Sequence, residues 1–79
     1  MPRYFFHTFD GGSFPDLEGQ ELPDEGAARL EAMRALPEIA RDAIPKDGDK
    51  QGYTVLVTDE DGRSIYSGSL SYAGVWLKL

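Results

Sequence analysis

The most informative segment of the chain is Tyr53-Thr54-Val55-Leu56-Val57-Thr58, which runs directly into Asp59-Glu60-Asp61-Gly62. β-Branched and aromatic residues dominate its first part and predict a strand over residues 53–58. The aspartates and glycine that follow are typical of a tight turn, and the apolar residues of 65–70 predict a returning strand. The sequence therefore predicts an antiparallel hairpin.

The register of this hairpin depends on its turn. A two-residue type I′ turn at Asp61-Gly62 puts apolar side chains on one face and hydroxyl side chains on the other. Its expected pairs are Thr58 with Ile65, Val57 with Tyr66, Val55 with Gly68 and Tyr53 with Leu70. A three-residue turn through 60–62 would shift the register by one and mix the faces. We favour the first register because it sorts the faces.

The N-terminal part predicts a second hairpin. Residues 3–9 alternate two largely aromatic faces, and Asp10-Gly11-Gly12 suits a turn that needs positive φ angles. Ser13 and Phe14 begin the return strand, which Pro15 limits because proline has no N–H to donate to a ladder. Residues 16–19 then predict another turn.

Between the hairpins the sequence predicts one amphipathic helix. Asp24 suits the N-cap, and the period of 3.6 residues continues to Ile44. One stripe is rich in alanine, which implies a close approach of helix to sheet. Pro37 interrupts the pattern, so we expect either a kink there or two helices, 25–36 and 37–44.

These elements predict an α+β fold in ββαββ order, with two hairpins in one antiparallel sheet and the helix on one face. The apolar end of the chain, 71–79, predicts a further C-terminal strand or a flap. At 79 residues the whole chain, 1–79, is expected to form one small domain.

Composition excludes several classes of partner and location. The net charge of −6 argues against direct binding to nucleic acid or to anionic membrane surfaces. No stretch approaches a membrane span or a signal-peptide core. The absence of cysteine removes disulfides and thiolate sites, and favours the cytoplasm for so small a domain.

No motif for catalysis, metal or cofactor binding emerges. His7 is the only histidine and has no evident partner for acid–base chemistry. The turn 59–62 and the segment 47–49 lack the glutamate spacing of a calcium loop. Gly11-Gly12 is not followed by the lysine and helix start of a phosphate loop. We therefore expect no catalytic residues, no cofactor and no metal.

Two surface features remain. Carboxylates gather between the first hairpin and the helix, and we interpret them mainly as a solvated connection with helix capping: Asp16, Glu18, Glu21, Asp24 and Glu25. Because one helix covers only one sheet face, apolar side chains should crowd the other face and the tail, as in interfaces. The interface candidates are Phe5, Phe9, Leu56, Ile65, Tyr72, Val75, Trp76 and Leu77.

The chain also resembles a family of short alphaproteobacterial proteins catalogued only as a domain of unknown function. The resemblance lies in the opening 2–7, Pro-Arg-Tyr-Phe-Phe-His, with Asp10-Gly11, and continues through 22–24 and 27–29 to 59–63. It implies no activity and no catalytic residues. Pro37 and the segment after Gly68 depart from the family pattern.

The function expected from these features is a non-catalytic cytoplasmic protein-interaction domain, which forms a homodimer or binds another protein. The alternative is a small acidic inhibitor or nucleic-acid mimic, of the phage-defence type, that occupies the basic groove of an enzyme.

Overall fold

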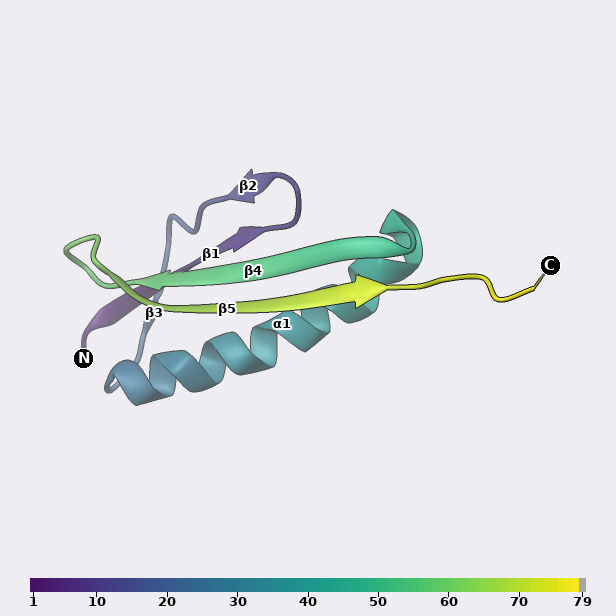
Figure 1. The fold of residues 1–79 in the computed structure, drawn as a ribbon. Coiled ribbons are helices and arrows are strands. Elements are labelled where there is room, and N and C mark those ends of the chain that lie inside the picture. The colour runs from purple at the N-terminus through teal and green to yellow at the C-terminus, as the bar shows by residue number, and fades with distance from the viewer. Residues whose placement is uncertain (79) are drawn as a thin grey trace.

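The protein is an antiparallel sheet of five strands with one helix against one face (Figure 1). The computed structural model describes residues 1–78, apart from the side chain of Asp47. The elements are β1 (Arg3–Phe9), β2 (Ser13–Phe14), β3 (Gln20–Glu21), α1 (Glu25–Asp47), β4 (Lys50–Thr58) and β5 (Ser64–Ala73). The predicted α+β class and ββαββ arrangement are confirmed, with β3 as an additional short strand.

The sheet order is β2-β1-β4-β5, and β3 pairs with the other end of β1. Thr8 and Phe9 of β1 pair with β2, whereas Arg3 and Tyr4 pair with β3, so both short strands lie along the same edge of β1. On its other side β1 pairs with β4 from Phe5 to Phe9. The long strand β5 forms the opposite edge of the sheet.

The core lies between α1 and the face of the sheet that carries Tyr4, Tyr53, Val55 and Val57. The helix meets them with residues at every fourth position, which lie above one another on one face. These helix residues are Ala28, Ala32, Leu36 and Ala40, all buried. Alanine at three of the four positions lets the helix backbone approach the sheet closely, as the sequence predicted.

Helix α1 begins as expected but does not divide. The Asp24 side chain caps it by accepting the N–H of Ala27 at 2.8 Å. The helix continues without interruption past Pro37 and Pro45 to Asp47. Of the two outcomes expected at Pro37, division into two helices is therefore wrong, and the predicted end near 44 is also wrong. Both prolines are exposed, and water can therefore satisfy the carbonyl groups that lose their N–H partners.

The turn between β4 and β5 differs from the favoured prediction, but the predicted register survives. The N–H of Asp59 donates to the Arg63 carbonyl at 2.9 Å, and the N–H of Gly62 donates to the Asp59 carbonyl at 3.0 Å. Gly62 has φ +81°, and no non-glycine residue described has positive φ. The loop is thus a three-residue turn, because a type I′ turn would need positive φ at Asp61 as well.

A β-bulge restores the register. Thr58 pairs with Ser64, not with Ile65 as predicted, and Val57 then pairs with Tyr66. The predicted pairs of Val55 with Gly68 and of Tyr53 with Leu70 are confirmed. Ile65 is the extra residue that absorbs the longer turn, so the apolar and hydroxyl faces stay separate.

The C-terminal residues do not form the predicted further strand. Residues 74–78 carry no regular structure and run away from the body of the molecule (Figure 1). Their anchor is the N–H of Gly74, which donates to the Asp49 carbonyl at 2.7 Å. Leu79 lies outside the described residues. No helix within 1–78 has the length and apolar character to cross a membrane.

Candidate interaction surface

The Asp16 carboxylate and the Arg3 guanidinium both connect the segment between β2 and β3 to β1, and Arg3 Nη1 donates to the Glu18 carbonyl at 2.8 Å. Asp16 accepts the backbone N–H groups of Phe6, Glu18 and Gly19, each at 3.1 Å. Burial acts to raise the pKa of this carboxyl, but the three donors and the nearby His7 outweigh it, so the pKa of Asp16 is lowered from 3.8. The carboxylate is therefore a structural group of the fold.

His7 belongs to the same network. Its Nδ1 accepts the N–H of Asp16 at 3.1 Å, so a neutral ring carries its proton on Nε2 and donates it to Thr58 Oγ1, also at 3.1 Å. Both ring nitrogens are thus engaged within the fold. Within residues 1–78, leaving aside the side chain of Asp47, no three His, Asp or Glu side chains are grouped to hold a metal ion.

The segment held by this network covers part of the sheet face on which exposed aromatic side chains were expected. A Cβ on Gly19 would lie 2.9 Å from a ring carbon of Phe5, so the segment around Gly19 lies directly against that ring. Phe5 and Leu56 are half-buried. Ile65 packs against the core cluster. These three interface candidates do not form one exposed patch. The segment 15–19 lies against Phe5, and Ile65 lies in the bulge and packs against the core cluster. The sequence predicted neither arrangement.

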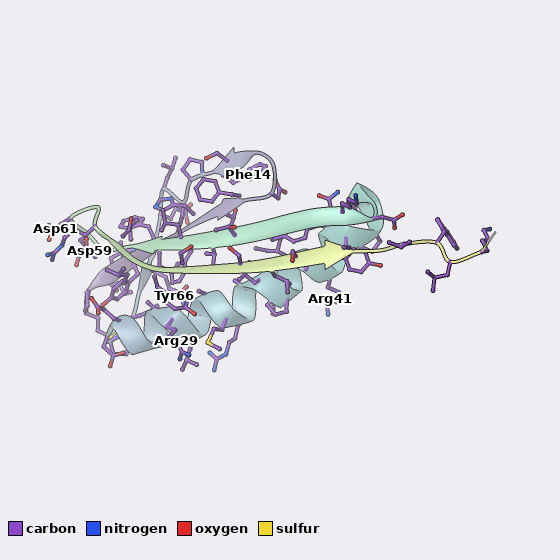
Figure 2. The ribbon with its side chains drawn as sticks, viewed as in Figure 1. Phe14, Arg29, Arg41, Asp59, Asp61 and Tyr66 are labelled. Atoms are coloured by element: carbon purple, nitrogen blue, oxygen red, sulfur yellow. The ribbon has the colours of Figure 1, made fainter. Side chains whose placement is uncertain are left out.

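The remaining candidates lie at two separate places. Phe9 is 36% exposed at the end of β1, beside the strand that holds the 56% exposed Phe14, which was not predicted (Figure 2). Tyr72 is at the end of β5, and Val75, Trp76 and Leu77 follow in the tail. The tail side chains are 76%, 77% and 91% exposed. These four predicted residues are thus exposed along one C-terminal segment, where they are already neighbours in sequence.

The acidic cluster is also divided. Asp16 and Asp24 are used by backbone N–H groups, and Glu21 lies 3.7 Å from the Arg3 guanidinium. The interpretation of these carboxylates as connection and capping groups agrees with this geometry. Elsewhere, Arg29 and Arg41 point from α1 away from the sheet (Figure 2).

The sequence did not reveal a shallow groove between α1 and β5. Its volume is about 250 Å³, and Tyr66 lies on its strand side (Figure 2). The lining residues are Met33, Leu36, Pro37, Tyr66, Gly68, Ser69 and Leu70. Gly68 opens it, since a Cβ there would lie 3.3 Å from Leu36 Cδ1. The only sequence signal was a glycine between apolar positions of a strand.

The family of the chain follows from comparison with known proteins. Residues 3–71 match the family described as Domain of unknown function (DUF6894). The chain belongs to this family. The resemblance inferred from the opening motif and the aspartate-glycine turns is thereby confirmed at the level of a family of unknown function. No curated protein and no solved structure matches the chain.

In this DUF6894 domain the family match ends at residue 71, two residues before the end of β5. The exposed tail therefore lies outside the matched region. The groove and most of β5 lie inside it.

Proposed function

We propose that this DUF6894 domain is a non-catalytic, cytoplasmic protein-interaction domain. It self-associates or binds another protein through the outer edge of β5 and the C-terminal tail. The observation that carries the proposal is the continuous run of exposed side chains from Leu70 to Leu77, beside a sheet edge that no described strand covers. Exposed apolar segments of this kind mark interaction sites.

The chemistry of the strand supports binding by backbone pairing. Residues Ser64–Ala73 contain neither a charged residue nor proline. Natural sheets usually protect an exposed edge with such residues, and an unprotected edge is where another strand adds. An interaction domain explains this edge, whereas a purely structural role leaves it unused.

The network around His7 supports the non-catalytic part of the proposal. A general base needs a nitrogen within reach of a substrate proton, and both ring nitrogens already have partners in the fold. The alternative of an acidic inhibitor rests only on the small size of the chain and its net charge of −6. Asp16, Asp24 and Asp59 are held by backbone N–H groups, which leaves fewer free carboxylates for a basic partner.

Truncation tests the proposal. The full chain and a variant without residues 74–79 would be compared by sedimentation velocity over a range of concentrations and by pull-down from the host. We expect the full chain to associate, and the truncated chain to associate more weakly. A matched Leu17→Ala variant removes one equally exposed apolar side chain (86% exposed) from the opposite edge and should behave as the full chain. Equal association of all three would contradict the proposal.

A further inference from the structure

The two edges of the sheet differ in how far other strands cover them. Along β1 the edge is occupied by two strands of only two residues each, with Pro15 and the Asp16 network between them. Along β5 the edge extends over ten residues, and the bulge affects only its first two. Tyr66–Ala73 therefore offers a regular row of backbone groups with no described partner on the outer side.

The side chains of β5 alternate in size and character. Positions on the helix side of the sheet carry Tyr66, Gly68, Leu70 and Tyr72, opposite Val57, Val55, Tyr53 and Gln51. Positions on the other face carry Ser67, Ser69 and Ser71. Because residues that face each other across an antiparallel pair share one side of the sheet, this pattern restricts which strand fits the edge.

We propose that a second copy of this chain occupies the edge, with the two β5 strands antiparallel about a two-fold axis at Ser69. This inference rests on the proposed function and specifies its partner. In this register Ser69 faces Ser69 of the second copy, Ser67 faces Ser71, Leu70 faces Gly68, and Tyr66 faces Tyr72. The Ser69 pair lies on the axis and occurs once, and each of the other pairs occurs twice, as a two-fold interface requires.

The register is complementary in volume. Leu70 is 37% exposed, and it comes to lie beside the glycine of the second copy, where a side chain is missing. The groove of about 250 Å³ next to Gly68 is lined by Leu36 and by Met33, which is 48% exposed. Leu70 of each copy therefore covers apolar surface in the groove of the other. The serines meet on the opposite face, where hydroxyl pairs are favourable.

The register is also complementary in charge. The loop with Asp59 and Asp61 lies at one end of β5, and the tail leaves from the other end (Figure 2). An antiparallel second copy therefore sends its tail towards this loop. In this register Ala73 faces Ile65 of the second copy. The five residues that follow Ala73, up to Lys78, span about 17 Å when extended, which is long enough to reach the loop that precedes β5. Lys78 thus approaches an acidic loop with three carboxylates and one arginine, 59–63.

In the proposed dimer the tail also contributes apolar contacts with the second copy. Trp76 and Leu77 are 77% and 91% exposed in one copy, where the Lys78 ammonium lies 4.8 Å from the centre of the Trp76 ring. Beside the hairpin of a second copy they extend the interface beyond the strand pair. A stable homodimer buries about 1,200–2,000 Å² or more in total, so contacts beyond one strand pair are needed.

A cross-linking experiment tests the register directly, because the chain has no cysteine of its own. Ser69→Cys places one thiol opposite itself, with Cβ atoms about 5 Å apart. We expect this variant of the full chain to form a covalent dimer on mild oxidation. Ser67→Cys alone should not, whereas a mixture of Ser67→Cys and Ser71→Cys should form the mixed dimer. Efficient self-linking by Ser67→Cys would overturn the proposed axis.

Sedimentation of the unmodified chain tests the dimer itself. We expect the unmodified chain to be a dimer at high micromolar concentration. Ser69→Lys sets like charges opposite each other and should raise the dissociation constant of the dimer at least about tenfold. Ser13→Lys, on the short strand β2 at the other edge, is the matched control and should leave the dimer intact. If Ser69→Lys does not fold by circular dichroism, the double variant Ser67→Lys, Ser71→Lys gives the same test, because each lysine then faces a lysine of the second copy.

The outcomes separate this inference from the proposed function. A strict monomer at high micromolar concentration, with no Ser69→Cys cross-link, overturns the two-fold dimer. The proposed function then stands only if removal of 74–79 still abolishes binding of a different protein. A dimer that needs the tail but does not cross-link through Ser69→Cys overturns the register alone. A chain that binds nothing overturns both.

Discussion

At the scale of single residues, Asp16 decides how the segment between β2 and β3 lies on the sheet. Its carboxylate accepts the backbone N–H of Phe6 in β1 and those of Glu18 and Gly19 in the turn. Its own N–H donates to His7, which in turn reaches Thr58 on β4. The network joins three segments that are far apart in sequence and covers part of the open sheet face.

Replacing this carboxylate should weaken the fold. Asp16→Ala is expected to lower the free energy of unfolding by about 1–3 kcal/mol, because hydrogen bonds to a charged acceptor are lost together. Urea denaturation measures the change. Glu18→Ala is the control, since that side chain lies in the same turn and is exposed. Similar losses in both variants would contradict the role given to Asp16.

Gly19 is required for two reasons, and they can be separated. Its φ is +71°, and a Cβ there would lie 2.9 Å from the Tyr4 carbonyl oxygen. Gly62 has a similar φ of +81° but open space around it. Gly62→Ala should therefore cost about 1–2 kcal/mol from backbone conformation alone, and Gly19→Ala distinctly more. Thermal or urea unfolding gives both values. Equal losses would show that the close approach to Tyr4 has no energetic effect.

The carboxyl groups of Asp16 and Asp59 should make the free energy of unfolding fall as the pH becomes acidic. The N–H of Arg63 is the main cause that lowers the pKa of Asp59, and Asp16 is lowered as described above. A carboxyl with a lower pKa in the folded state stabilises the fold above its unfolded value, here 3.8, and this contribution is lost as the pH falls through the folded pKa.

We therefore expect the urea midpoint to fall as the pH is lowered from about 5 to below 3.8. In the double variant Asp16→Asn, Asp59→Asn the midpoint at neutral pH should be lower and its dependence on pH smaller. Asp42→Asn, at an exposed helix position, should keep the full dependence. A double variant with an unchanged pH profile would exclude these two groups as its cause.

At the scale of elements, α1 combines a seam suited to the sheet with two prolines that oppose helix formation. The seam of alanine and Leu36 packs on β4 and β5, and this packing outweighs the lost hydrogen bonds at Pro37 and Pro45. Tertiary packing commonly exceeds helix propensity in this way.

Removing the interior proline should stabilise the helix. Pro37→Ala restores an N–H and relieves crowding of the preceding turn, and we expect a gain of about 1–3 kcal/mol. Pro45→Ala, in the last turn, should gain less, because few helical bonds follow it. Differential scanning calorimetry compares the two. A loss of stability in Pro37→Ala would mean that the ring contributes more to packing in the groove than it costs in the helix.

At the scale of the whole molecule, the core and the tail are separate in energetic terms. The tail residues 74–78 are anchored by one hydrogen bond, from Gly74 to Asp49, and three of their side chains are more than three-quarters exposed. Among residues 1–78, none of the buried core residues comes from this segment. We therefore expect the tail to serve association in the proposed dimer and to contribute little to the folding of one copy.

Truncation should separate these two roles. Removing 74–79 is expected to change the free energy of unfolding of the monomer by no more than about 1 kcal/mol, the value of one net hydrogen bond. Leu36→Ala, in the buried seam, should cost about 2–5 kcal/mol. Urea denaturation at low protein concentration makes the comparison. A large loss on truncation would show that the tail belongs to the core of a single copy.

Much of the fold was predictable because it depends on local pattern. The strand at 53–58, the Asp24 cap, the alanine seam and the pairs of Val55 and Tyr53 all follow from periodicities that neighbouring residues share. The errors arose where two local signals competed. At Asp61-Gly62 a three-residue turn and a bulge gave the same final register as the simpler turn, and only Ile65 moved.

The candidate site was predictable only in part. Tyr72 and the tail were identified because an apolar, uncovered segment is visible in sequence. The groove at Gly68 and the covering of Phe5 and His7 were not, since each depends on residues brought together from distant segments.

The sequence by itself determined the elements, their order and the apolar faces, because these depend on side-chain periods of 2 and 3.6 residues. Tertiary structure alone decided which edge of the sheet stays open and which face is partly covered. It also decided that residues 74–78 join no strand of the part of the chain that the structure describes. Those features depend on where backbone donors and acceptors find partners in space, and local pattern does not contain that information.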